Sequence, residues 1–290
     1  MLAIFGLLGL ALAGMALIPG PETAEVAEPE DMPEDDLEGD PGTGLLQLID
    51  GPSGPSENVV LFDGAGDGTL QGGAGADYLD GEEGRDTLHG AAGDDILHGG
   101  TGDDSLYGGD GADALFGHVG DDLMEGGAGH DTLSGGDGAD RIDGGTGDDS
   151  LQGSLGDDTL VGGAGADVLH GGAGADLVDG RSGEEAGAEA DYLNGGAGDD
   201  RIEAGAGDIA SGGTGADTFG LVSGTEGAAV VQDFDPAEDR ILLRYAGESP
   251  PEVEIAATPE GTELRANGSL VAFFPGLAGF DAALVDLAPR

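Results

Sequence analysis

The sequence predicts an all-β fold, a parallel β-roll of the β-solenoid class that ends in a C-terminal β cap. Three observations lead to this prediction. A nine-residue pattern repeats through the middle of the chain, each unit holds one aliphatic residue at a fixed position, and short apolar runs follow the last unit. Glycines and adjacent aspartates disfavour helix and ordinary strand, so each unit is interpreted as a turn followed by a very short strand.

The repeat extends from Asp63 to Asp179 as thirteen units without an insertion or a deletion. From Gly72 onward the first and fourth positions are always glycine, the sixth is aspartate and the eighth is aliphatic. The register breaks after Gly180, returns at residues 195–203, shortens to one eight-residue unit and ends with residues 212–220. We therefore expect the β-roll to span residues 61–220.

The unit itself explains why two units should form one coil. Glycines tolerate the positive φ values of a tight turn, and the last three residues of the unit can form a short strand. Side chains alternate along a strand, so one aliphatic residue per unit points inward. Two units give an 18-residue coil with strands on opposite faces, and the inward rows of two parallel sheets meet as a narrow core.

Composition restricts the partners of the chain. The formal charge is −52, the 8 basic residues are all arginine, and there is no cysteine. Nucleic acid and anionic lipid are excluded as expected partners because both require clustered basic residues. A disulfide framework and thiolate metal sites are excluded as well. Cations are the natural partners of such a chain.

The sixth-position aspartates are the candidate metal ligands. Residues 18 apart should lie above one another, where their carboxylates repel unless a cation lies between them. The first edge of the roll should carry Asp77, Asp95, Asp113, Asp131, Asp149 and Asp167, and the second Asp86, Asp104, Asp122, Asp140, Asp158 and Asp176. Three later aspartates hold the same place in their units, Asp191, Asp200 and Asp217.

The expected ion is Ca²⁺. A hard divalent cation takes six to eight oxygen ligands, and turn carbonyls can complete a shell begun by two carboxylates. Calcium suits such a roomy, irregular site better than magnesium, which prefers a tight octahedron. The two edges together predict on the order of ten Ca²⁺ ions.

The units GGTGDDSLY, GGAGADVLH and GGAGADLVD resemble the GGxGxDxUx nonapeptide of the RTX (repeats-in-toxin) calcium-binding family. The resemblance covers Asp63 to Gly220 and implies a parallel β-roll, calcium held between turns, and extracellular delivery in bacteria. The segment VVQDFDPAEDRILL, residues 230–243, is similar to the strand-turn-strand that often follows such repeats. A carboxy-terminal signal for type I secretion is usual there, so that secretion machinery is an expected partner.

The terminal segments have separate interpretations. Residues 1–18 are uninterruptedly apolar or small and are interpreted as a signal peptide or a retained membrane anchor. Proteins with the RTX pattern do not normally need such an N-terminal segment. Residues 19–60 are acidic and proline-rich, which predicts a disordered linker. Residues 221–290 contain β-like runs at 229–231, 241–243, 253–255 and 270–274, and we expect a β cap there with a secretion signal.

No enzyme is predicted, because the sequence holds neither an HExxH motif nor a GxSxG motif. None of the five histidines has another histidine 18 residues away, so we expect exposed turn or strand positions and no transition-metal site. Fifth-position aspartates such as Asp94 are expected to be solvated charges that raise the local calcium concentration.

Two functions follow. The first is a secreted or cell-surface calcium-binding module that has a structural or interaction role and an unknown extracellular partner. The alternative is the non-catalytic calcium-binding part of an RTX-type secreted hydrolase or toxin system.

Overall fold

The computed structural model describes residues 58–181, 189–224 and 227–290. The chain divides into a unit of Met1–Gly39 and a unit of Asp40–Arg290, and the second contains every described residue. The predicted signal or anchor segment, residues 1–18, and most of the predicted linker, residues 19–60, lie outside these residues. Within the described part of the chain, no helix has the length and apolar character needed to cross a membrane.

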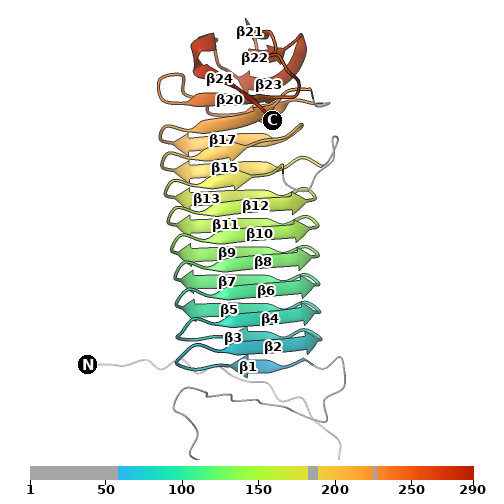
Figure 1. Cartoon of the computed structure of the whole chain (residues 1–290), viewed down its shortest axis with the longest axis vertical. Coiled ribbons are helices and arrows are strands. Elements are labelled where there is room, and N and C mark those ends of the chain that lie inside the picture. Colours follow the sequence, from blue (N-terminus) through green and yellow to red (C-terminus); the bar gives the residue numbers. More distant parts are fainter. Residues whose placement is uncertain (1–57, 182–188, 225–226) are drawn as a thin grey trace, which may run out of the picture. The chain divides into compact units, whose positions relative to one another are not determined.

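Two sheets form the β-roll, and the chain passes from one to the other at each unit (Figure 1). The 13-stranded sheet follows the order β1-β3-β5-β7-β9-β11-β13-β15-β17-β19-β23-β22-β21, and the 11-stranded sheet follows β2-β4-β6-β8-β10-β12-β14-β16-β18-β20-β24. Neighbouring strands from β1 to β20 pair in parallel, mostly 18 residues apart, as β10 pairs with β12 through Ile142 and Leu160. The predicted all-β parallel β-roll is therefore confirmed.

The strands of the first sheet are β1 (Val60–Phe62), β3 (Tyr78–Asp80), β5 (Ile96–Thr101), β7 (Ala114–Val119), β9 (Thr132–Asp137), β11 (Ser150–Leu155), β13 (Val168–Ala173), β15 (Tyr192–Ala197), β17 (Ile209–Thr214), β19 (Ala229–Val231), β21 (Val253–Ala257), β22 (Gly261–Ala266) and β23 (Ser269–Pro275). The strands of the second sheet are β2 (Thr69–Ala74), β4 (Thr87–Ala92), β6 (Ser105–Asp110), β8 (Leu123–Ala128), β10 (Arg141–Thr146), β12 (Thr159–Ala164), β14 (Leu177–Asp179), β16 (Arg201–Glu203), β18 (Thr218–Val222), β20 (Arg240–Tyr245) and β24 (Val285–Pro289). A 3₁₀ turn, η1 (Ala282–Leu284), precedes β24.

Most strands are longer than the predicted three residues. Strand β5 begins with the expected triplet around Leu97 and continues through the first three positions of the next unit to Thr101. The ladder between β5 and β7 skips Gly99 and resumes at Gly100, which pairs with His118. Glycine composition alone indicated a turn here, whereas the backbone groups of these glycines still bond to the neighbouring coil.

The fourth position of each unit requires glycine for two reasons. Gly111 has φ +145°, a conformation that residues with a side chain rarely adopt. A Cβ added at Gly111 would also lie 2.0 Å from the carbonyl oxygen of Gly93 in the preceding coil. Close stacking of coils therefore excludes every other residue from this position.

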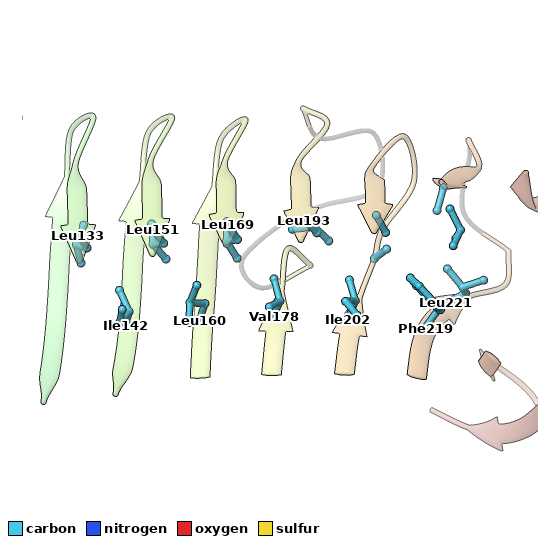
Figure 2. Close-up of a cluster of buried hydrophobic side chains, with 14 of the residues drawn as sticks. Leu133, Ile142, Leu151, Leu160, Leu169, Val178, Leu193, Ile202, Phe219 and Leu221 are labelled. Atoms are coloured by element: carbon cyan, nitrogen blue, oxygen red, sulfur yellow. The ribbon is translucent and has the colours of Figure 1, made fainter. Parts of the chain in front are cut away.

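The core is a double row of side chains, one from each repeat strand, and Figure 2 shows the rows facing each other between the sheets. Leu133, Leu151 and Leu169 come from one sheet, and Ile142 and Leu160 from the other. All five are at most 1% exposed. Burial of one such side chain contributes roughly 1.5 to 3 kcal/mol, so the core is continuous but thin.

Aromatic side chains close the C-terminal end of this core. Phe234 lies 5.9 Å from Phe219 of β18, 5.3 Å from Phe274 of β23 and 5.2 Å from Phe280, measured between ring centroids. Strands β21, β22 and β23 form an antiparallel extension of the first sheet. Strands occur at all four apolar runs expected after Gly220, and β22 and β24 were not foreseen.

A cluster of arginines surrounds one buried carboxylate near the register break. Glu203 is 2% exposed and pairs with Arg181 at 2.5 Å, with Arg244 at 3.0 Å, and with Arg201. Burial would raise the pKa of Glu203, but hydrogen bonds from Arg244 and Arg201 and the charge of Arg181 outweigh burial and hold that pKa below its usual value. At this end of the roll, arginine side chains therefore supply the positive charge that compensates a buried carboxylate.

Candidate metal centre

The sixth-position aspartates immediately precede the repeat strands and form two columns of backbone-to-carboxylate hydrogen bonds. The Asp95 N–H donates to Oδ1 of Asp113 at 2.8 Å, and the Asp113 N–H donates to Oδ1 of Asp131 at 2.8 Å. Each carboxylate thus points back toward the preceding coil. The first column contains Asp77, Asp95, Asp113, Asp131, Asp149, Asp167, Asp191 and Asp208. The second contains Asp86, Asp104, Asp122, Asp140, Asp158, Asp176, Asp200, Asp217 and Asp239.

The columns continue through the register break. The bond from Asp167 to Asp191 joins residues 24 apart, and that from Asp176 to Asp200 also spans 24 residues, although 18 is the usual separation. The shortened unit changes the separation to 17 between Asp200 and Asp217. The ladder therefore brings together all fifteen aspartates predicted from the repeat, in two sets.

The second carboxylate oxygens are buried. The fifteen predicted aspartates are only 1% to 3% exposed. Within the described residues, the following aspartates have a buried Oδ2 without a hydrogen-bond partner: Asp63, Asp77, Asp86, Asp95, Asp104, Asp113, Asp122, Asp131, Asp140, Asp149, Asp158, Asp167, Asp176 and Asp200. A buried, unpaired carboxylate oxygen is costly, and one repeated along two columns indicates a ligand that satisfies it.

The free oxygens line small spaces that only glycine leaves open. A Cβ added at Gly108 would lie 2.4 Å from Oδ2 of Asp113 and 2.6 Å from the carbonyl oxygen of Gly126 in the next coil. The first position of the unit is therefore glycine because its missing side chain makes room beside a carboxylate and a carbonyl. An equivalent pair of oxygens flanks Gly90, where an added Cβ would lie 2.3 Å from Asp95 Oδ2 and 2.7 Å from the Gly108 carbonyl oxygen.

These oxygens fit calcium. Across residues 58–181, 189–224 and 227–290, no three His, Asp or Glu side chains converge on one point, so a metal there would take carbonyl ligands as well as carboxylates. Calcium accepts that mixture in irregular geometry, whereas nitrogen- and sulfur-preferring metals would find no suitable donors in the columns.

Comparison with known proteins agrees with this geometry. A sequence model described as RTX calcium-binding nonapeptide repeat (4 copies) matches residues 62–97, 89–124, 116–151, 152–184 and 185–208, just over half of the 290-residue chain. The chain belongs to the RTX calcium-binding nonapeptide repeat family. The resemblance noted in the sequence is thereby confirmed, and RTX repeats bind Ca²⁺. No curated protein matches the chain.

Two solved structures are similar to parts of the RTX chain. One is the solution structure of the AlgE6R3 subunit of the Azotobacter vinelandii mannuronan C5-epimerase, with 31% identity, a TM-score of 0.30, and coverage of 49% of this chain and 80% of that one. The other is the crystal structure of the extracellular lipase LipA of Serratia marcescens, with 17% identity and a TM-score of 0.32. That match covers 72% of this chain and 41% of the lipase.

Burial changes the acidity of the RTX columns. Desolvation raises the pKa of Asp95 and Asp113 to about 6 and that of Asp122, Asp149 and Asp158 to about 7. The backbone hydrogen bond to each carboxylate opposes this rise, and neighbouring carboxylates of the same column add to it. The columns therefore favour protonation or a bound cation over bare negative charge.

We expect the calcium-free RTX roll to gain stability as the pH falls. The folded columns have raised pKa values and bind protons more tightly than the unfolded chain, whose aspartates titrate near their ordinary value of about 3.9. Ionised buried carboxylates destabilise the calcium-free folded state. This effect is complete above about pH 7 and disappears below about pH 4. Circular dichroism in chelator should therefore show more β structure at about pH 5 than at about pH 8. A β signal that falls steadily on acidification through this window contradicts the prediction.

Three further aspartates lie within or beside the RTX columns, and the repeat does not predict them. Asp63 takes the first position of the first unit, residues 63–71, which has glycine at its sixth position, and its Oδ2 lies 1.4 Å from where a Cβ of Gly68 would be. Its carboxylate thus fills the space that a sixth-position side chain would occupy. Asp208 lies in the shortened unit, and Asp239 directly follows the turn at residues 236–238. In this unit aspartate stands at position 63, where later units have glycine, and glycine stands at position 68, where they have aspartate. This exchange is the sequence signal that could have identified Asp63.

The fifth-position aspartates of the RTX units have a different environment. Asp94 is exposed, and its Oδ1 accepts the Ala112 N–H of the next coil at 3.0 Å. Asp121 is bonded to Ala139 in the same way at 2.8 Å. These carboxylates point toward the following coil and stay in solvent, so they are not equivalent to the column aspartates.

Proposed function

We propose that this protein is a secreted β-roll that folds on binding Ca²⁺ outside the cell and acts there as a structural or interaction module. The observation that carries the proposal is the repeated buried Oδ2 atom that faces a glycine gap and a carbonyl oxygen, as at Asp113, Gly108 and Gly126. A cation between coils would satisfy these oxygens and neutralise the carboxylates.

Each ion would lie between successive coils and take oxygens from both. The ligand residues would be the fifteen predicted aspartates, with on the order of ten ions in the two columns. Asp208 and Asp239 would instead end the columns, because their Oδ2 atoms already accept the N–H groups of Gly205 and Asp235.

Calcium concentration would separate the two states of the chain. Sites with a dissociation constant of about 0.1 mM would be empty at cytosolic calcium of about 0.1 µM and filled at extracellular calcium of about 1 mM. An extended acidic chain could then pass through a type I exporter and fold only at its destination. In this proposal the chain is not an enzyme, and its extracellular or cell-surface partner is unspecified.

The direct test compares Asp113→Asn with Asp94→Asn in calorimetric calcium titrations. Both variants remove one charge, and both retain a side-chain oxygen to accept the neighbouring N–H. We expect Asp113→Asn to weaken calcium binding by about tenfold at the sites shared with its column neighbours, because it removes the buried charged ligand. Asp94→Asn should change the titration much less, since its carboxylate is exposed.

The number of bound ions is the second readout. A loss of sites in Asp113→Asn alone supports ligation by the column aspartates. Equal stoichiometry and equal midpoints in the two variants contradict the assignment of these aspartates as ligands.

A further inference from the structure

Two histidines from successive coils meet on the outer face of the first sheet. His98 lies on β5, and His118 lies on β7, where it pairs with Gly100 of β5. Nδ1 of His98 lies 2.8 Å from Nε2 of His118, and the two rings are within 17° of parallel. The 18-residue period of the coil predicts no histidine pair, because these two histidines are 20 residues apart.

Neighbouring rings hold the pair in place. His98 stacks on Phe116 at a centroid distance of 4.8 Å and contacts Tyr78 at 5.4 Å. His118 has φ +76° at the second position of its unit, where most other units have a glycine. The backbone is therefore in an unfavourable region for a residue with a side chain, and it directs this imidazole against His98.

We propose that His98 and His118 form a two-histidine site for a divalent transition-metal ion, Cu²⁺ or Ni²⁺. Imidazole nitrogens about 2.0 Å from a metal and at adjacent corners of a tetragonal complex are about 2.8 Å apart. The two ring nitrogens already have that separation. Each neutral imidazole can place its proton on the other ring nitrogen, so binding requires no net proton loss.

The site is chemically separate from the aspartate columns. Imidazole nitrogen suits copper and nickel, whereas calcium selects oxygen ligands. Asp80 pairs with His98 in register on the adjacent strand and adds a negative charge beside it. Within the described residues no third His, Asp or Glu joins the pair closely enough to complete a cluster, so water would fill the remaining positions.

The test is a Cu²⁺ titration of the full chain at saturating calcium, which keeps the roll folded and the carboxylate columns occupied. Paramagnetic resonance of the bound Cu²⁺ should show coupling to two imidazole nitrogens. His118→Gly should weaken this binding by about tenfold or more, because one arm of the chelate is lost. The variant restores the usual residue of the repeat and removes the positive-φ strain, so we expect it to fold at least as well as the parent.

Two further variants complete the test. His98→Gln places the residue found at the equivalent Gln152 and should remove the same site. His170→Gln is the matched control, because His170 is an exposed histidine at the same unit position, and it should bind Cu²⁺ as the parent does. Parent-like Cu²⁺ affinity and two-nitrogen coupling in His118→Gly would overturn the proposal. Loss of the signal in His170→Gln would overturn it as well.

Discussion

Removal of calcium at neutral pH is expected to abolish most of the β structure of the roll. The chain carries a formal charge of −52, and the two columns bring buried carboxylates into successive coils. Without a cation these charges lack compensation, while the core supplies only one buried aliphatic side chain for each unit. Circular dichroism in excess chelator should show a largely unfolded chain, and near-millimolar calcium should restore the signal.

The control is the choice of cation. Magnesium at the same ionic strength should restore much less structure, because it holds its water and demands tighter geometry. Full recovery with magnesium would show that general charge screening suffices. A chain that keeps its entire β signal in chelator at neutral pH would exclude calcium-dependent folding.

Truncation after Gly220 is expected to raise the calcium midpoint by roughly tenfold or more and to broaden the folding transition. The shortened chain loses β19 and β20, which pair with β17 and β18, and so exposes the end of the core. Phe219 loses its contact with Phe234, and the Asp217 N–H loses its acceptor on Asp239. Calcium titration followed by circular dichroism measures both the midpoint and the steepness.

The matched deletion removes residues 1–57 and begins the chain at Asn58. This change leaves every described strand in place, so its calcium midpoint should stay close to that of the parent. If the N-terminal deletion shifts the midpoint and the C-terminal truncation does not, the C-terminal strands are not the cap on which the roll is completed.

The repeat made the inner architecture predictable. An aliphatic residue every nine positions and an aspartate at a fixed offset leave little freedom once the chain coils, and residues such as Leu151 and Asp149 lie where the pattern places them. Strand length could not be predicted from the pattern, because glycine indicates a turn even where its backbone groups join the ladder. The ladder shows that Gly145 pairs with Gly163 inside strands β10 and β12.

What the pattern could not provide depends on contacts between different positions of the repeat. His98 and His118 occupy different positions of their repeat units, so a comparison of residues 18 apart does not predict their contact. Arginines from three separate segments converge on the buried carboxylate of Glu203. Asp239 ends a column through a turn with Asp235, in a segment where the repeat has already stopped. These features arise from tertiary proximity and have no period.

The spacing of the columns has a consequence for how such a chain can change its length. Hydrogen bonds connect aspartates that are 18, 24, 17 or 22 residues apart. Stacking of the coils therefore fixes where successive aspartates lie next to each other, while the number of residues between them can vary. Duplication of one whole coil would add one aspartate to each column and leave both ends unchanged. Duplication of a single unit would instead exchange the sheets and turn the cap onto the opposite face. Genetic growth of the array should therefore proceed by pairs of units, with the cap as a fixed terminus.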